Sequence, residues 1–203
     1  MHLKAIKTDP KLVKTEYARK LAALTPGFSG ADIMNICNEG AIIAARKELD
    51  MVTIREFEQA TERVIGGIER KLPQSQQERK TVAYHEAGHA VAGWFSESAA
   101  PLIKLTIIPR AKGSLGFAQY LPDELTLYTT EQLEDMIVVA LGGRISEEIF
   151  FKKVTTGASD DFKKCAQIAH GMVTEYGMST ILGTINYAMD ENTGQKKFAE
   201  STN

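Results

Sequence analysis

The stretch Ala83-Tyr84-His85-Glu86-Ala87-Gly88-His89-Ala90 decides how this chain of 203 residues is interpreted. It lies in residues 76–95, which we predict to form one long helix. Helix positions four apart lie on one face, so His85 and His89 can both reach a single zinc ion. Glu86 can then act as a base towards a water beside the metal. The pattern predicts a zinc peptidase site. The alternative is that the two histidines are incidental, but a chance match to this five-residue pattern is improbable in a chain with only four histidines.

A catalytic zinc site needs a third protein ligand, and the residues alone leave its identity open. The candidates are two adjacent pairs of carboxylates, Glu147-Glu148 and Asp160-Asp161. The second pair lies at a predicted helix start, where carboxylates also interact favourably with the helix dipole. His2 and His170 are weaker candidates, because neither lies in a metal-ligand pattern.

Around this helix the sequence predicts a mainly α chain in two parts. Residues 1–70 are expected to be helical, with Ser29 and Thr53 as N-caps. A polar segment at 72–78 is expected to link the two parts. The second part is expected to contain a hairpin formed by residues 103–108 and 115–121. Two further helices are expected at 130–151 and 159–176, and a short final strand at 183–188.

Composition excludes several function classes. The 24 Lys and Arg against 26 Asp and Glu give a net charge of −2, so there is no basic footprint for nucleic acid. No apolar run approaches the length of a membrane-spanning helix, and no targeting segment is visible at Met1. Only two cysteines occur, Cys37 and Cys165, which excludes a disulfide framework and indicates reduced thiols.

In this order, the motifs resemble the AAA+ zinc metalloproteases of the FtsH type, and among them the mitochondrial m-AAA branch. The resemblance extends over essentially the whole chain. Its motifs are residues 25–32, 38–46, 83–90, 107–110, 115–122, 141–148 and 155–161. It implies a mainly α fold in which residues 1–70 form a helical AAA+ lid. Residues 75–203 would form a zinc metallopeptidase domain of the M41 type with a small β-hairpin or sheet.

The resemblance also implies roles for the site residues. The family's third zinc ligand matches Asp161, so Zn²⁺ would be held by His85, His89 and Asp161. Asp160 stands where the family usually has Asn, and Glu147 and Glu148 would be structural or supporting groups. The implied reaction is attack of a zinc-activated water on the peptide bond, with Glu86 as the general base.

The lid resemblance implies nucleotide contacts at His2, Gly30 and Ala31. ATP with Mg²⁺ would be bound mainly elsewhere, because the chain has no G-x-x-x-x-G-K-[ST] phosphate loop. We therefore expect the ATPase core and membrane helices to precede Met1, and further peptidase helices to follow Asn203.

The expected whole protein is an ATP-dependent zinc metalloendopeptidase that degrades membrane and unfolded proteins. It would form a homo- or hetero-hexamer in the mitochondrial inner membrane, with its catalytic domains in the matrix; a bacterial or plastid membrane is the alternative location. The rival functions are a catalytically silent assembly or chaperone-like subunit of the same complex, and an ATP-independent metallopeptidase.

Overall fold

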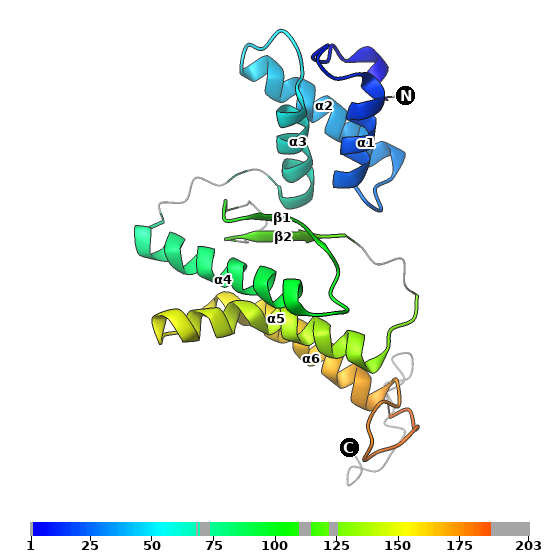
Figure 1. The fold of residues 1–203 in the computed structure, drawn as a ribbon, viewed down its shortest axis with the longest axis vertical. Helices are drawn as coiled ribbons and strands as arrows, with labels where there is room; N and C mark the ends of the chain where they lie inside the picture. The colour runs from blue at the N-terminus through cyan, green and yellow to red at the C-terminus, as the bar shows by residue number, and fades with distance from the viewer. Residues whose placement is uncertain (1, 68, 70–73, 110–114, 122–125, 188–203) are drawn as a thin grey trace, which may run out of the picture. The chain divides into compact units, whose positions relative to one another are not determined.

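The computed structural model describes residues 2–67, 69, 74–109, 115–121 and 126–187. Within them the fold is mainly α with one two-stranded antiparallel sheet, which confirms the predicted fold class. In chain order the elements are η1 (His2–Ala5), α1 (Lys14–Leu24), α2 (Gly30–Arg46), α3 (Ile54–Gly66), α4 (Gln76–Phe95), β1 (Leu102–Thr106), β2 (Phe117–Tyr120), α5 (Thr130–Phe151), η2 (Thr156–Ala158) and α6 (Ser159–Thr174) (Figure 1).

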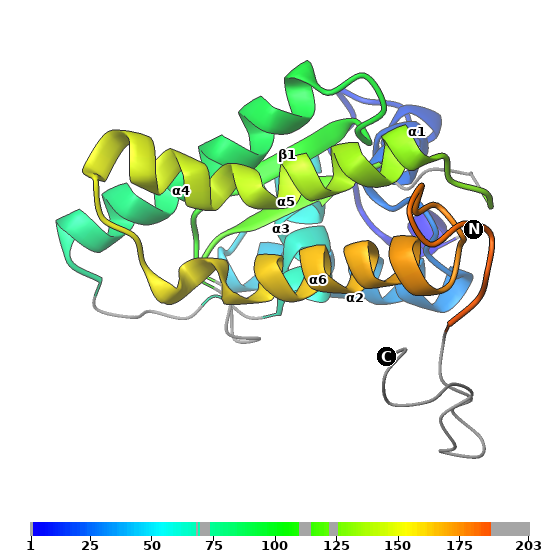
Figure 2. The same cartoon turned by 90° about the horizontal axis from the view of Figure 1, so that it is seen from below.

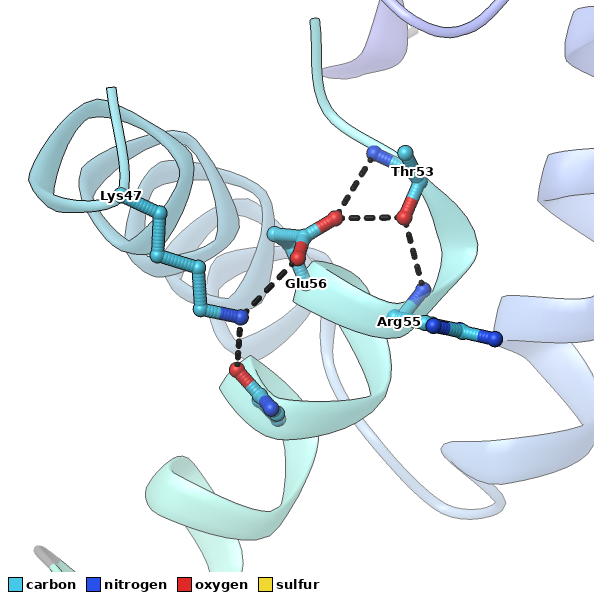
Figure 3. Close-up of polar contacts among 5 residues, drawn as sticks. Lys47, Thr53, Arg55 and Glu56 are labelled. Atoms are coloured by element: carbon cyan, nitrogen blue, oxygen red, sulfur yellow. Dashed lines mark hydrogen bonds and ion pairs between the residues drawn. The ribbon is translucent and has the colours of Figure 1, made fainter. Parts of the chain in front are cut away.

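Local capping chemistry sets where several helices begin. Reciprocal capping boxes precede α2, α3 and α5, with Ser29, Thr53 and Thr129 as the N-caps. The predictions for Ser29 and Thr53 are therefore confirmed. Figure 3 shows the box at α3, where Thr53 donates to the Glu56 carboxylate and Lys47 Nζ donates to Glu56 Oε1 at 3.0 Å.

The chain divides into two compact units that do not follow sequence order. The first comprises Met1–Glu86 and Ala100–Asp123, and the second comprises Ala87–Ala99 and Glu124–Asn203. The hairpin thus groups with the N-terminal helices, and α4 supplies residues to both units. Residues 72 and 73 of the expected linker lie outside the described residues, and α4 already begins at Gln76.

The first unit has a small apolar core among α1, α2 and α3. Tyr17 and Phe57 meet edge to face in this core, with ring centroids 5.8 Å apart. Gly40 of α2 lets the ring of Phe57 approach closely, because a Cβ at this position would lie 2.9 Å from Phe57 Cδ1. The buried members of the core are Tyr17, Leu21, Ile36, Cys37, Ala44, Val52, Phe57 and Ala60.

The predicted hairpin is confirmed by antiparallel pairing of β1 and β2, with a register shift between Leu102 and Lys104. Two side chains connect it to helices of the same unit. Lys104 forms an ion pair with Glu62 of α3. Gln119 Nε2 donates to the Leu24 carbonyl at the end of α1, at 2.9 Å. The turn of the hairpin, residues 110–114, lies outside the described residues.

The second unit is helical, and α5 and α6 lie side by side in it (Figure 2). The backbones of α4 and α5 also approach closely. A Cβ at Gly88 would lie 2.3 Å from the Gly142 carbonyl oxygen, and one at Gly142 would lie 2.6 Å from the Gly88 oxygen. Glycine at both positions therefore permits this crossing. Among the described helices, none combines the length and hydropathy needed to cross a membrane.

The strand expected at 183–188 is wrong for its described part, residues 183–187. Gly177 and Gly183 adopt positive φ values of 64° and 75°, which turn the chain rather than extend it. Tyr187 N then donates to the Thr174 carbonyl at 2.7 Å, so the segment folds back onto the end of α6. Ala188 lies outside the described residues.

Candidate metal centre

Helix α4 brings its two histidines to one face. His85 and His89 are separated by one turn, and each is only 8% exposed. An imidazole that is buried without a partner is costly, so this placement requires compensating interactions. Two buried imidazoles one turn apart are the donor pair that a zinc ion takes from a helix.

Asp161 reaches the same place from the first turn of α6. One potential ligand atom from each of His85, His89 and Asp161 lies within 4.8 Å of the others. His89 Nε2 and Asp161 Oδ2 are 3.5 Å apart. Tetrahedral zinc with bonds of about 2.0–2.1 Å holds its ligand atoms roughly 3.3–3.4 Å apart, so this spacing fits the ion.

The second ring nitrogen of His89 is also engaged. Nδ1 lies 2.8 Å from the Val139 carbonyl oxygen of α5. A carbonyl only accepts hydrogen bonds, so Nδ1 is the donor and the neutral ring keeps its lone pair on Nε2. Nε2 is the nitrogen that faces Asp161. Metal-binding histidines almost always show this arrangement, which supports a metal rather than an incidental histidine pair.

The four carboxylates that the sequence left open have different environments. The Asp161 side chain is 16% exposed and belongs to the cluster, whereas that of Asp160 is 81% exposed and pairs with Lys163. Glu147 is 1% exposed, and both its oxygens accept hydrogen bonds from Thr155. The side chain of Glu148 is 61% exposed and lies 3.7 Å from Arg144. Of the four, Asp161 is the one grouped with the histidines.

Glu86, the predicted base, is half-buried and lies against the residue that precedes β2. A Cβ at Gly116 would lie 2.2 Å from Glu86 Oε1, so any residue other than glycine at this position would displace the carboxylate. The sequence places Gly116 in the expected hairpin but assigns it no role beside Glu86, although a glycine at a strand is a signal for close approach. Thr155 likewise appears only as part of the motif at 155–161, and its hydrogen bonds to Glu147 were not predicted, although threonine side chains commonly bond to nearby backbone groups.

The predicted nucleotide residues lie on η1 and α2, and none of them belongs to the cluster of His85, His89 and Asp161. His2 begins η1, and Gly30 and Ala31 begin α2; all three are exposed. A Cβ at Gly30 would meet open space. His170 is exposed on α6, where Thr174 Oγ1 lies 3.2 Å from its Nδ1, and it is not grouped with His85 and His89.

Both cysteines are free thiols, as the sequence indicated. Burial raises the pKa of the Cys165 thiol, and the nearby charge of Asp161 raises it further. Burial also raises the pKa of Cys37. Both thiols are therefore neutral at physiological pH and poorly suited to bind a metal, which takes the thiolate.

Comparison with known families agrees with this geometry. Residues 73–203 match peptidase family M41, and residues 18–59 match the AAA+ lid domain. The chain therefore belongs to peptidase family M41, joined here to an AAA+ lid.

Its relatives lie in the branch that the sequence motifs indicated. It is 54% identical over its whole length to the mitochondrial inner membrane m-AAA protease component AFG3L2 of Mus musculus. It is 52% identical, over 97% of its length, to the component YTA10 of Saccharomyces cerevisiae. It is also 48% identical over its whole length to the mitochondrial ATP-dependent zinc metalloprotease FTSH 10 of Arabidopsis thaliana. The chain spans about a quarter of the length of these relatives, covering 26%, 26% and 25% of them respectively.

Proposed function

We propose that this chain supplies the peptidase site and the ATPase lid of an ATP-dependent zinc metalloendopeptidase. The observation that supports this most directly is the cluster of His85, His89 and Asp161, in which His89 Nδ1 is held by the Val139 carbonyl. The residues fit zinc in type, spacing and tautomer.

The roles of the chain's own residues follow from this assignment. His85, His89 and Asp161 would hold the zinc ion, which supplies Lewis-acid activation of water and of the scissile carbonyl. Glu86 accepts the proton of the attacking water and then donates it to the leaving amine nitrogen. Gly116 leaves space for the Glu86 carboxylate beside β2.

For the rest of the chain we propose residues 1–70 as the lid and 75–203 as the peptidase domain. His2, Gly30 and Ala31 would approach ATP with Mg²⁺ that is bound mainly by regions outside these 203 residues. The whole protein would act in a homo- or hetero-hexamer on unfolded or membrane proteins. Its location would be the mitochondrial inner membrane, with the catalytic domains in the matrix. The names of the relatives support the inner-membrane part of this proposal.

Zinc stoichiometry, measured by elemental analysis on metal-replete and dialysed protein, tests the site. We expect one zinc per chain, lost in Asp161→Asn and retained in the matched control Asp160→Asn. The reverse order would refute the ligand assignment. In the whole protein, Glu86→Gln should retain zinc and lose hydrolysis of an unfolded substrate. Unchanged hydrolysis would instead favour another base.

A further inference from the structure

The third metal ligand depends on how α6 begins. Asp161 lies in the first turn of α6, but the N-cap residue Ala158 offers no side-chain hydrogen bond. The start of α6 is preceded directly by η2, which packs against both α5 and α6. Whatever fixes η2 therefore also fixes the direction from which Asp161 approaches His89.

Thr155 and Glu147 fix η2 through three hydrogen bonds. Thr155 N donates to Glu147 Oε2 at 2.7 Å, and Thr155 Oγ1 donates to Glu147 Oε1 at 3.1 Å. The same hydroxyl accepts from Gly157 N at 3.2 Å and so caps η2. A threonine hydroxyl has one donor and two acceptor positions, so both functions are possible at once.

The burial of Glu147 shows that these bonds are specific. It is among the largest fully buried side chains of the described residues, and a buried carboxylate is tolerated only with strong partners. Its neighbour Glu148 is of the same type on the same helix, yet its side chain is 61% exposed. Consecutive helix residues face different sides, and it is Glu147, on the buried side, that accepts the two hydrogen bonds from Thr155.

We propose that Thr155 and Glu147 together are positioning residues for the third metal ligand: they hold η2 on α5 and thereby aim Asp161 at His89. This inference rests on the proposed zinc site. Supporting residues of this kind typically change metal affinity by about 10–100-fold when they are removed. Thr155 is itself exposed, so removing its hydroxyl opens no cavity. The buried Glu147 carboxylate would still lose one hydrogen bond, so stability must be measured beside affinity.

The test compares the zinc affinity of matched variants of the whole 203-residue chain by competition with a chromophoric chelator. Thr155→Val removes the hydroxyl and keeps the branched shape, Thr155→Ser restores the hydroxyl, and Thr156→Val makes the same change one residue on. Glu147→Gln is compared with Glu148→Gln. Urea unfolding of the metal-free proteins separates a loss of stability from a loss of affinity.

We expect Thr155→Val and Glu147→Gln to weaken zinc binding by about 10–100-fold, with the other three variants within about threefold of the parent. The variant that combines Thr155→Val with Glu147→Gln should lose no more zinc affinity than the more strongly affected single variant, because the two residues act as one unit. Parental affinity in Thr155→Val would overturn the proposal, as would an equal loss in Thr156→Val. Failure of the parent chain to bind zinc would instead refute the proposed metal site itself.

Discussion

Substitution of Gly88 by alanine tests the helix crossing that supports the metal centre. The added Cβ would lie 2.3 Å from the Gly142 carbonyl oxygen, which is 0.7 Å less than the 3.0 Å that real Cβ atoms keep. The obstacle is backbone, so it cannot rotate away, and Ser146 Cβ would also be too close, at 2.7 Å. Helices α4 and α5 must therefore move apart by roughly the missing distance.

Two opposing effects determine how much the free energy of unfolding changes in Gly88→Ala. Alanine favours a helix interior over glycine by about 1 kcal/mol, which would stabilise the variant. Overpacking costs about 1–3 kcal/mol where side chains can adjust and more where they cannot, so we expect net destabilisation by about 1–2 kcal/mol. Metal–ligand distances in well-formed sites agree with their usual values within about 0.2 Å, so a larger displacement of α4 disturbs the site. Zinc affinity should accordingly fall by about 100-fold or more.

The assay is urea unfolding of the metal-free protein together with zinc affinity by chelator competition. Gly30→Ala is the matched control, because a Cβ there would meet open space. It should leave both quantities near their parental values. If Gly88→Ala were as stable as the parent and bound zinc equally well, the close approach of Gly88 to Gly142 would be refuted.

Three further outcomes are expected. Gly116→Ala should reduce hydrolysis by the whole protein at least about tenfold by displacing the Glu86 carboxylate, while zinc content stays at the parental level; a simultaneous loss of zinc would contradict this role. Burial raises the pKa of Glu56, but hydrogen bonds from Thr53 and Lys47 outweigh it and hold the pKa below 4.5. The ionised Glu56 carboxylate therefore stabilises the fold fully above pH 4.5, and this stabilisation is lost as the pH falls through the lower pKa of the folded state. In Glu56→Gln, the free energy of unfolding in urea should accordingly depend less on pH in this acid range. Cys165 should react with iodoacetamide only slowly at pH 7, because its pKa is raised, and mass spectrometry should show the rate rising in more alkaline buffer.

Sequence reasoning succeeded where a local rule determines the structure. The caps Ser29 and Thr53 set helix starts through hydrogen bonds within three residues, so no tertiary information was needed. The spacing of His85 and His89 is likewise a property of one helix, and it predicts a shared metal before any fold is known. The hairpin also followed from local strand and turn signals.

Tertiary contacts decided the rest. Asp160 and Asp161 are adjacent, and only the direction of α6 makes one pair with Lys163 while the other faces His89. Glu147 is buried and accepts hydrogen bonds from Thr155, whereas its neighbour Glu148 is exposed. The strand expected at 183–188 is wrong for its described part, because positive φ at Gly183 turns the chain there.

The bond between His89 and α5 ends on a main-chain atom, and this has a consequence for the tolerance of the site to mutation. The acceptor is the carbonyl of residue 139, so the side chain at that position takes no part in orienting the imidazole. Exchange of Val139 for another apolar residue of similar volume leaves the acceptor in place. Substitutions of the side chain at position 139 therefore leave the orientation of His89 unchanged. Changes that shift the axis of α5 would alter it, because they move the carbonyl that accepts its hydrogen bond.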